Sequence, residues 1–371
     1  MNVPTLRTNR SRVSLAVIAR NEEAVIGRCL ESAKQVVDEL IVVDTGSQDR
    51  TRELASKAGA KVIECPWVDD FSAARNASLD ACAGEWILVL DADEYLPESS
   101  GKAIRHLLSK PCPSPRAFQL INKSSTDGGK TGMLGKIVRL FPNRPDVRYE
   151  WPVHEQVATS LQRANIPIFD TDIEIIHTGY SSTEVNQKKQ TRNLRILDGF
   201  LSKTPDPHPM LYFLYGGALL DLGRPSDALQ AYQRCQEKVS PGDPLHQGAI
   251  VRQVTCLADL ERFSEIRCLA PSLPLEQCHP ELLLFFAQAE LNAGNNATAI
   301  NHLQLAIEKP DCVSIPAYDP VRARARAALM LAEAFQHSLP KASISLLRLA
   351  KDSLATGHRI KMEDVLSAMQ S

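Results

Sequence analysis

The sequence predicts an α/β domain with a mostly parallel sheet, followed by an all-α domain of helical repeats. In the first half, nearly continuous apolar strands alternate with helices, and after residue 204 the strand patterns stop and Ala- and Leu-rich helices take over. Apolar strands joined by helices are typical of a parallel sheet covered on both faces. We therefore expect an N-terminal tail (1–12), an α/β domain (13–203) and a helical domain (204–371).

The expected elements follow one another in this order. Apolar β-type runs predict the first strands at Ser14–Ala19, Glu39–Thr45, Ala60–Cys65 and Glu85–Leu90. Helical spacing predicts the helices between and after them at Glu23–Lys34, Asp49–Ala58 and Phe71–Cys82. Shorter strands are expected at Ala117–Asn122, Lys136–Phe141 and Ile173–His177, before a helix over Thr183–Leu201.

Two segments of the second half align with each other. One begins at Leu211 and the other at Leu283, and in each a small residue precedes a glycine turn by seven positions. The two turn glycines, Gly223 and Gly294, are 71 residues apart, which is close to two periods of about 34, the length of a tetratricopeptide repeat. Small residues let antiparallel helices approach closely, so the pattern favours such repeats over a plain helical bundle.

Composition excludes several classes of protein. The formal net charge of −2 gives no reason to expect nucleic-acid binding. We expect no transmembrane segment and no secretory signal. Nine cysteines without a Cys-x-x-Cys pair are typical of reduced thiols, which predicts a cytoplasmic protein. Peripheral attachment to the inner face of the membrane stays open.

Polar clusters follow three of the predicted strands where each one ends. They are Arg20-Asn21-Glu22, Asp44-Thr45-Gly46-Ser47 and Asp91-Ala92-Asp93-Glu94. In an open parallel sheet, ligands bind at the carboxyl ends of the strands. Carboxylates two residues apart can address one hard divalent cation whose other ligands are water and phosphate oxygens. The pattern therefore indicates a metal-assisted site for a diphosphate.

These clusters lie in segments that resemble the family 2 glycosyltransferases, which have the GT-A fold. The resemblance covers about residues 13–200 and is sharpest in LAVIARNEEAVIGRCLES, IVVDTGSQDRT, DFSAARNASL and WILVLDADE. It is closest to a bacterial branch with tetratricopeptide-like repeats, near lipopolysaccharide-core glucosyltransferases and bacteriocin cysteine glycosyltransferases. The resemblance implies inverting transfer from a nucleotide-diphosphate sugar, usually a UDP-sugar, to a nucleophile on an acceptor.

The resemblance also implies which residues form the site. Asp44 is expected to accept a hydrogen bond from the uracil or the ribose. The other residues expected at the nucleotide are Arg20, Asn21, Glu22, Arg75 and Asn76. Asp93 is expected to bind the cation, Mn²⁺ or Mg²⁺, directly. Asp91 is expected to contact the ribose or a metal-bound water, which makes it a second candidate for the metal site.

An inverting transfer needs a base that takes the proton of the acceptor. The best candidate is Glu155 in WPVHEQV, and the alternative is that His154 and Glu155 form a local polar turn. His177 is a candidate for completing the metal shell, because imidazole binds such ions, and His154 is its competitor. Lys188, Arg192 and Arg195 share one helix face, which meets either the diphosphate or only solvent.

Other functions fit the residues less well. A degenerate scaffold whose repeats bind protein partners has no need of Asp44, Asp91, Asp93 and Glu155 together. Dinucleotide binding lacks its Gly-x-Gly-x-x-Gly after the first strand, and a nucleotidyltransferase lacks a basic, Gly-rich loop at 19–24. The repeats predict a protein, peptide or glycan acceptor, while a lipid-linked acceptor and a homodimer stay open.

Overall fold

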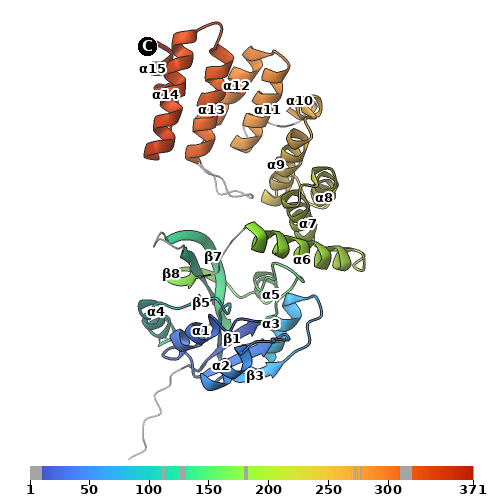
Figure 1. Cartoon of the computed structure of the whole chain (residues 1–371), viewed down its shortest axis with the longest axis vertical. Helices are drawn as coiled ribbons and strands as arrows, with labels where there is room; N and C mark the ends of the chain where they lie inside the picture. The colour runs from blue at the N-terminus through green and yellow to red at the C-terminus, as the bar shows by residue number, and fades with distance from the viewer. Residues whose placement is uncertain are drawn as a thin grey trace, which may run out of the picture. The chain divides into compact units, whose positions relative to one another are not determined.

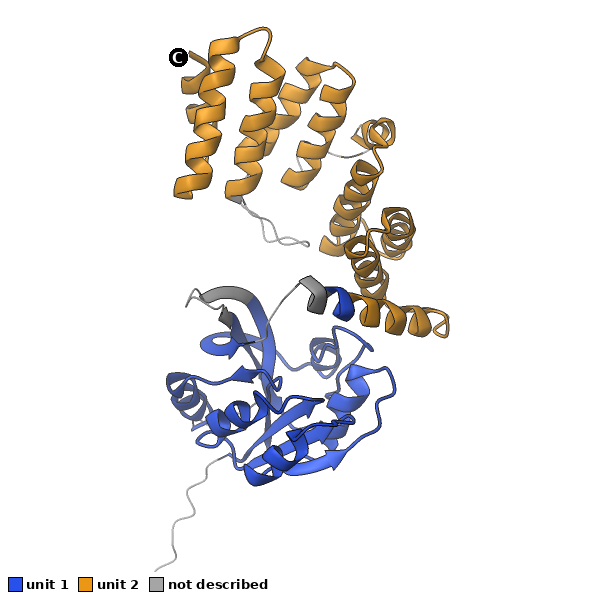
Figure 2. Ribbon diagram, viewed as in Figure 1, with its two compact units in different colours: residues 1–189 blue, residues 190–371 orange. Residues whose placement is uncertain are grey.

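The computed structural model describes residues 11–109, 114–125, 131–178, 183–270, 273, 275, 278–309 and 320–370. The chain divides into two compact units, Met1–Lys189 and Gln190–Ser371 (Figure 2). This division falls within helix α6 (Thr183–Leu201), whereas the sequence predicts a boundary just after that helix, between residues 203 and 204. Residues 1–10 of the expected N-terminal tail lie outside the described residues.

Unit 1 is built on one sheet, whose described strands have the order β3-β2-β1-β4-β7-β6-β8-β5 (Figure 1). The strands are β1 (Val13–Ala19), β2 (Glu39–Asp44), β3 (Lys61–Glu64), β4 (Trp86–Val89), β5 (Glu94–Tyr95), β6 (Ala117–Ser125), β7 (Thr131–Pro142) and β8 (Ile168–His177). Strands β1 to β4 run parallel, as expected. Strand β7 is antiparallel to both β4 and β6, so the sheet is mixed beyond β4.

Helices cover both faces of this sheet. In unit 1 they are α1 (Ile26–Ala33), α2 (Thr51–Lys57), α3 (Phe71–Asp80), α4 (Glu98–Ser109) and α5 (Ala158–Arg163). Leu15 and Val17 of β1 pack in one core with α1 and α4, while Ala16 between them packs in a second core with Leu79 of α3. Because successive side chains of a strand point to opposite faces, this alternation confirms the predicted layers.

Three described elements were absent from the sequence prediction, namely β5, α4 and α5. Strand β5 has only two residues and is defined by its pairing with β8, which no local pattern reveals. Helix α4 buries Ser100, Gly101, Ile104 and Leu108, so small and polar residues occupy half of its inward face. An apolar periodicity is therefore hard to recognise there.

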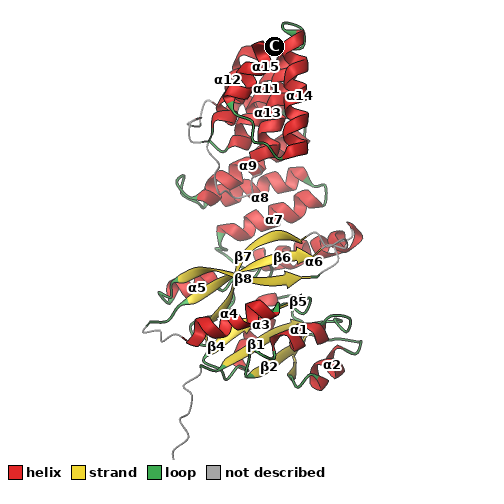
Figure 3. Cartoon of the chain, turned by 90° about the vertical axis from the view of Figure 1, so that its left-hand side faces the viewer, coloured by secondary structure: helices red, strands yellow, loops and turns green. Residues whose placement is uncertain are grey.

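The described residues of unit 2 form helices joined by turns, without strands (Figure 3). They are the C-terminal part of α6, then α7 (Pro209–Asp221), α8 (Pro225–Glu237), α9 (Pro244–Asp259), α10 (Phe263–Leu269), α11 (Pro280–Asn292), α12 (Asn296–Glu308), α13 (Pro320–Phe335), α14 (Pro340–Thr356) and α15 (Met362–Gln370). Helices α11 to α14 stand side by side in Figure 1. Short turns join α7 to α8 and α11 to α12, and a left-handed glycine lies in each, Gly223 (φ 72°) and Gly294 (φ 79°).

The two aligned segments have the same local structure. In the first, Nδ1 of His208 accepts a hydrogen bond from the backbone N–H of Met210 at the start of α7 (3.2 Å). In the second, Nδ1 of His279 accepts the equivalent bond from Glu281 at the start of α11 (3.2 Å). Both histidines precede a proline at the first helical position, where the missing N–H costs nothing. This shared cap supports the predicted repeat.

Close helix packing explains the small residue of the first segment. A Cβ atom at Gly216 of α7 would lie 2.8 Å from the ring of Tyr232 on α8. Tyr232 is fully buried, so its ring has little room to move.

Across the described residues, the structure contains no helix that is both long and apolar enough to span a membrane.

Candidate active site

Asp44 lies at the end of β2 and is 1% exposed. Its Oδ1 accepts hydrogen bonds from the backbone N–H groups of Gly46 (3.1 Å) and Ser47 (2.9 Å). Gly46 has a φ of 105°, a conformation that favours glycine. The second oxygen, Oδ2, is buried without a hydrogen-bond partner among the described residues. A buried acceptor of this kind is costly unless a ligand supplies a donor.

The loop after β1 is fastened to the loop after β2. The backbone N–H of Asn21 donates to Oγ of Ser47 (2.9 Å), and its side-chain Oδ1 accepts from the N–H of Gln48 (2.8 Å). The N–H of Glu22 donates to Oγ1 of Thr51 (2.7 Å). Asn21 and the backbone of Glu22 therefore help to shape this edge of the sheet.

The loop after β4 brings Asp93 to His177. Glu94 of β5 pairs with His177 of β8 in the antiparallel register, and the carbonyl of Asp93 accepts the N–H of Thr178 (2.9 Å). As a result, Oδ2 of Asp93 lies 3.1 Å from Nε2 of His177, with the two side chains 26% and 27% exposed. The sequence predicts a choice between His154 and His177, and the structure brings His177 to Asp93. His154 is exposed, in a left-handed conformation (φ 55°).

The Asp93–His177 pair fits a divalent cation. Two neighbouring ligands of an octahedral ion, each about 2.1 Å from the metal, lie about 3 Å apart, close to the observed separation. Within the part of the chain that the structure describes, His, Cys, Asp and Glu do not form a group of three that could hold an ion. A cation here would therefore take further ligands from a diphosphate or water.

Nearby charges also favour a cation. Burial raises the pKa of Glu22 to about 7, and the negative charges of Asp93 and Asp49 add to this effect. The hydrogen bond with Asp93 raises the pKa of His177 above its usual value, although burial opposes the change. Both groups thus hold protons in a region of concentrated negative charge, where a metal ion would supply the same compensation.

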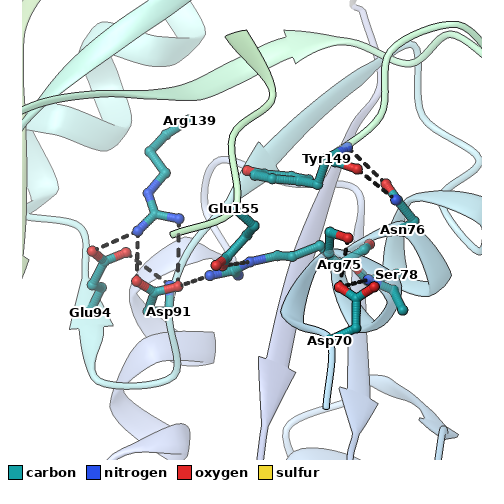
Figure 4. A network of polar contacts seen from close by, with 11 residues as sticks. Asp70, Arg75, Asn76, Ser78, Asp91, Glu94, Arg139, Tyr149 and Glu155 are labelled. Atoms are coloured by element: carbon teal, nitrogen blue, oxygen red, sulfur yellow. Dashed lines mark hydrogen bonds and ion pairs between the residues drawn. The ribbon is translucent and has the colours of Figure 1, made fainter. Parts of the chain in front are cut away.

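Asp91 lies two residues from Asp93 but has different partners (Figure 4). Nη2 of Arg75 on α3 donates to Oδ1 of Asp91, and Nη2 of Arg139 on β7 donates to Oδ2 (2.7 Å). Burial disfavours the charge of Asp91, but Arg139 and Arg75 outweigh it and hold the pKa of the carboxyl well below its usual range. Asp91 is therefore an ionised carboxylate between two guanidinium groups.

Arg139 is absent from the residues predicted from the sequence. It is 3% exposed, and its Nη2 also donates to Oε1 of the buried Glu94 (2.9 Å). A signal was available, because Arg139 is the one charged residue in the apolar run Ile137-Val138-Arg139-Leu140-Phe141. A positively charged side chain in an otherwise apolar, buried strand indicates a buried anionic partner.

Glu155 is the second carboxylate that Arg75 binds, besides Asp91. Nε of Arg75 donates to Oε1 of Glu155 (3.0 Å), and the Glu155 side chain is 15% exposed. The other oxygen, Oε2, receives no hydrogen bond from any described residue. The sequence predicts Arg75 at the nucleotide, and the structure buries it, 5% exposed, in contact with two carboxylates. Figure 4 shows both carboxylates at the guanidinium group of Arg75.

A strained loop carries Glu155. Backbone hydrogen bonds in both directions between Glu150 and Gln156 (both 2.9 Å) close the loop. Within it, Trp151 and His154 have φ values of 76° and 55°, a left-handed conformation that costs about 1–3 kcal/mol for such residues. Strain of this kind persists only where the surroundings impose it, and it is frequent at functional sites.

Helix α3 holds this loop in place. The side chain of Asn76 donates to the carbonyl of Tyr149 and accepts from its N–H (both 2.9 Å). The N–H of Phe71 donates to the carbonyl of Pro152 (2.9 Å). Both polar atoms of the Asn76 side chain are thus engaged with the backbone at Tyr149, so the structure gives Asn76 a positioning role where the sequence predicts nucleotide contact.

The remaining predicted residues lie at the surface. Arg20 follows β1 and is exposed. Lys188, Arg192 and Arg195 of α6 are exposed as well, and Arg192 donates through Nη2 to Oδ1 of Asn193 (3.0 Å). Their exposure is compatible with either of the predicted alternatives, contact with a diphosphate or with solvent alone.

Comparison with known proteins finds similarity to glycosyltransferases and to a protein with helical repeats. Residues 14–113 match the model of the family described as glycosyl transferase family 2. A TPR repeat-containing protein of Synechococcus elongatus is 35% identical over 307 residues, an alignment that covers 81% of this chain and 67% of that protein. The SPbeta prophage-derived glycosyltransferase SunS of Bacillus subtilis is 27% identical over 235 residues, which cover 60% of this chain and 53% of SunS.

Other similarities are shorter or more distant. An uncharacterized glycosyltransferase of Rickettsia felis is 38% identical over 98 residues, 26% of this chain and 34% of that protein. The chain thus spans about a third to two thirds of these relatives. Among solved structures, TarS of S. aureus aligns with a TM-score of 0.44 and 14% identity, over 67% of this chain and 53% of TarS.

Proposed function

The chain belongs to the family 2 glycosyltransferases, and on that basis we propose that it transfers a sugar with inversion from a nucleotide-diphosphate sugar, in the first instance a UDP-sugar. One observation carries the proposal. The loop that follows β4 takes part in both pairs, because its Asp93 meets His177 and its Asp91 contacts Arg75, which holds Glu155. A metal site and a held carboxylate are the two components that such a transfer requires.

Asp44 would recognise the base or ribose of the donor. Its Oδ1 is held by two backbone N–H groups, while the buried Oδ2 has no partner among the described residues. The imide N–H of uracil or a ribose hydroxyl would supply the missing donor. Asn21 and Glu22 shape the adjacent loop, and Arg20 lies at its exposed edge.

Asp93 and His177 would hold the divalent cation, Mn²⁺ or Mg²⁺. When bound, the ion would neutralise the diphosphate and stabilise it as a leaving group. The backbone orients the site, because β5 pairs with β8 at Glu94 and His177 and the carbonyl of Asp93 accepts the N–H of Thr178. Glu22 lies near enough to Asp93 for its pKa to respond, so it would lose its proton and add negative charge beside the site once the ion is bound.

Glu155 would act as the base. Arg75 holds Oε1 at 3.0 Å, which leaves Oε2 to accept the proton of an acceptor nucleophile as that nucleophile attacks the anomeric carbon. Arg75 orients Glu155 by a directed, charge-assisted hydrogen bond. An attack from the face opposite the leaving diphosphate inverts the anomeric centre.

Unit 2 would contribute to acceptor binding. It contains a cavity of about 320 Å³ that is lined by both acidic and basic side chains and by two tyrosines. Its lining includes Asp198, Tyr212, Tyr215, Arg224, Asp227 and Arg234. Cavities from about 300 Å³ upward are in the range that binds small ligands. The mixed charges support a polar acceptor segment, such as a peptide or glycan, in preference to a lipid tail.

The test is turnover of UDP-sugars by the purified chain with Mn²⁺ or Mg²⁺. We expect hydrolysis or transfer, and we expect Asp93→Ala to abolish it while the fold is retained. Asp172→Ala, at an exposed position of β8, is the matched control and should keep wild-type activity. Wild-type turnover by Asp93→Ala would contradict the metal assignment. Lack of turnover of every donor by a folded wild-type chain would favour the scaffold alternative.

A thermal-shift screen identifies the donor independently of the acceptor. A ligand that binds only the folded state raises the apparent stability by mass action. We expect one nucleotide-sugar class to raise the Tm in the presence of Mn²⁺ and not in EDTA. A rise in Tm with guanosine donors alone would still support a glycosyltransferase, but the nucleobase of the donor would be guanine instead of uracil.

A further inference from the structure

The structure assigns different tasks to the two aspartates of Asp91-Ala92-Asp93. We infer that Asp91 does not bind the cation but positions the base Glu155, acting through Arg75, and that Arg139 holds Asp91 in place for this purpose. Asp91 and Arg139 are positioning residues in this account. The inference rests on the proposed function, because it assumes that Glu155 is the base and that Asp93 binds the metal.

The partners of Asp91 leave no favourable position for a divalent ion. Oδ2 accepts a hydrogen bond from Nη2 of Arg139 (2.7 Å), and Oδ1 accepts from Nη2 of Arg75 and, at 3.5 Å, from Nη1 of Arg139. A cation bound to Asp91 would lie beside the positive charges of both Arg75 and Arg139, which repel it. Asp93, two residues away, has an imidazole as its partner instead.

The contacts form one chain of alternating charge across the site (Figure 4). In spatial order, its members are Glu155, Arg75, Asp91, Arg139 and Glu94. The far end is anchored, because Oε1 of Glu94 also accepts from Nδ2 of Asn122 (2.9 Å) and Oε2 accepts from the backbone N–H of Asp91 (2.8 Å). Such buried ion pairs contribute little net stability but fix geometry.

Arg75 transmits the position of Asp91 to Glu155. Its Nη2 bonds to Asp91 and its Nε bonds to Glu155, so one planar guanidinium group joins both carboxylates. Its third nitrogen, Nη1, is buried and has no partner in the described part of the chain. Because the guanidinium group is planar and rigid, the bond from Nη2 to Asp91 helps to fix the direction in which Nε meets Glu155.

The backbone around Glu155 is held by other contacts. Asn76 and Phe71 of α3 bind Tyr149 and Pro152, and the Glu150–Gln156 pair closes the loop. None of these bonds involves Asp91 or Arg139. Loss of Asp91 should consequently disorder the Glu155 side chain without releasing the loop, which predicts an effect on kcat rather than on folding.

The first experiment separates Asp91 from the metal. Binding of Mn²⁺ in the presence of UDP is measured by electron paramagnetic resonance of the free ion, for the wild type, Asp91→Asn and Asp93→Asn. We expect Asp91→Asn to keep the Kd for Mn²⁺ within about twofold, and Asp93→Asn to lose binding. An equal loss in both variants would overturn the inference, because Asp91 would then be a ligand.

The second experiment tests whether Asp91 acts through Glu155. Asp91→Asn should lower kcat by roughly a hundredfold, the scale of a misplaced catalytic group, with little change in KM for the donor. Adding Asp91→Asn to Glu155→Gln should give little further loss, because the group that Asp91 positions is already inactive. Independent, multiplying losses would contradict the inference.

Arg139→Lys extends the test to a residue that does not touch the substrate site directly. It keeps the charge but not the forked geometry, so we expect reduced kcat, an unchanged Kd for Mn²⁺ and a wild-type circular dichroism spectrum. If Arg139→Lys does not fold, Asp91→Asn, which preserves volume, decides the question alone. If Glu155→Gln turns over at the wild-type rate, the proposed base is wrong. If Asp91→Asn turns over at the wild-type rate while Glu155→Gln is inactive, Glu155 remains the proposed base and the positioning role of Asp91 is wrong.

Discussion

Oδ2 of Asp93 lies 3.1 Å from Nε2 of His177, and a strand of only two residues brings these side chains together. In β5, Glu94 pairs with His177 of β8, which fixes the backbone beside both groups. The carbonyl of Asp93 accepts the N–H and the hydroxyl of Thr178 as well (2.9 and 2.8 Å). The metal site proposed here therefore depends on backbone pairing as much as on the side chains.

The proton and the cation should compete for His177. Since Asp93 raises the pKa of His177, the apo pair stabilises the fold most below the usual value of 6.5 and loses this contribution as pH rises through the raised pKa. A metal ligand must be the neutral imidazole. We expect Mn²⁺ affinity to increase from pH 6 to pH 8 in calorimetric titrations. His177→Ala should weaken binding and remove most of this increase; a pH-independent wild-type affinity would contradict the ligand assignment.

Glu22 predicts a second pH effect, in the metal-free protein. Its pKa of about 7 in the fold lies above the usual value of 4.5, so the native state holds a proton that the unfolded chain releases. Stability should therefore fall as pH rises from about 4.5 to about 7. Glu22→Gln should flatten this fall in denaturation experiments with EDTA. Glu85→Gln, at an exposed position, is the control and should keep the wild-type dependence of stability on pH. If Glu22→Gln also kept the wild-type dependence, the prediction would be wrong.

Glu155→Gln should separate binding from transfer. The amide keeps the size of the side chain but cannot take the acceptor proton, so kcat should fall by roughly 10²–10⁴-fold. Donor binding, measured by calorimetry with the UDP-sugar and Mn²⁺, should stay near wild type. Glu150→Gln is the control, because the Glu150 carboxylate bonds to Arg163 and Thr159 instead of Arg75. An equally severe loss of donor binding in Glu155→Gln would indicate a structural role.

Helix packing in unit 2 can be tested by two neighbouring glycines. Gly216→Ala would force a Cβ to 2.8 Å from the Tyr232 ring, and we expect a loss of about 1–3 kcal/mol. At Gly217 the nearest atom, the Tyr232 hydroxyl oxygen, lies at 3.8 Å, so Gly217→Ala should be neutral or stabilise by up to about 1 kcal/mol through helix propensity.

Urea unfolding provides the measurement. All three tryptophans lie in unit 1, whereas circular dichroism follows the helices of both units. Gly216→Ala should shift the dichroism transition and leave the tryptophan fluorescence transition near its wild-type midpoint. Equal shifts in Gly216→Ala and Gly217→Ala would show that the close contact with Tyr232 does not matter.

The sequence by itself determined the layered α/β unit, the helical repeats and the polar strand ends. Strands such as β1 and β2 are apolar runs, and burial of such runs depends on hydrophobicity that can be read locally. The resemblance in the four motifs then indicated the family, which the comparisons confirmed. The positions of Asp44, Asp91 and Asp93 at strand ends follow from the same local order.

Only the tertiary structure decided which of these side chains meet. Arg139 enters the site because β7 runs antiparallel to β4, and His177 reaches Asp93 because β8 pairs with β5. Asn76 appears in a motif as a candidate ligand, yet its amide is engaged with the backbone of Tyr149. Local patterns in the sequence indicate whether a residue is buried. Ion pairs and hydrogen bonds depend instead on the distances between segments that are remote in the chain, and these distances are set only when the sheet forms.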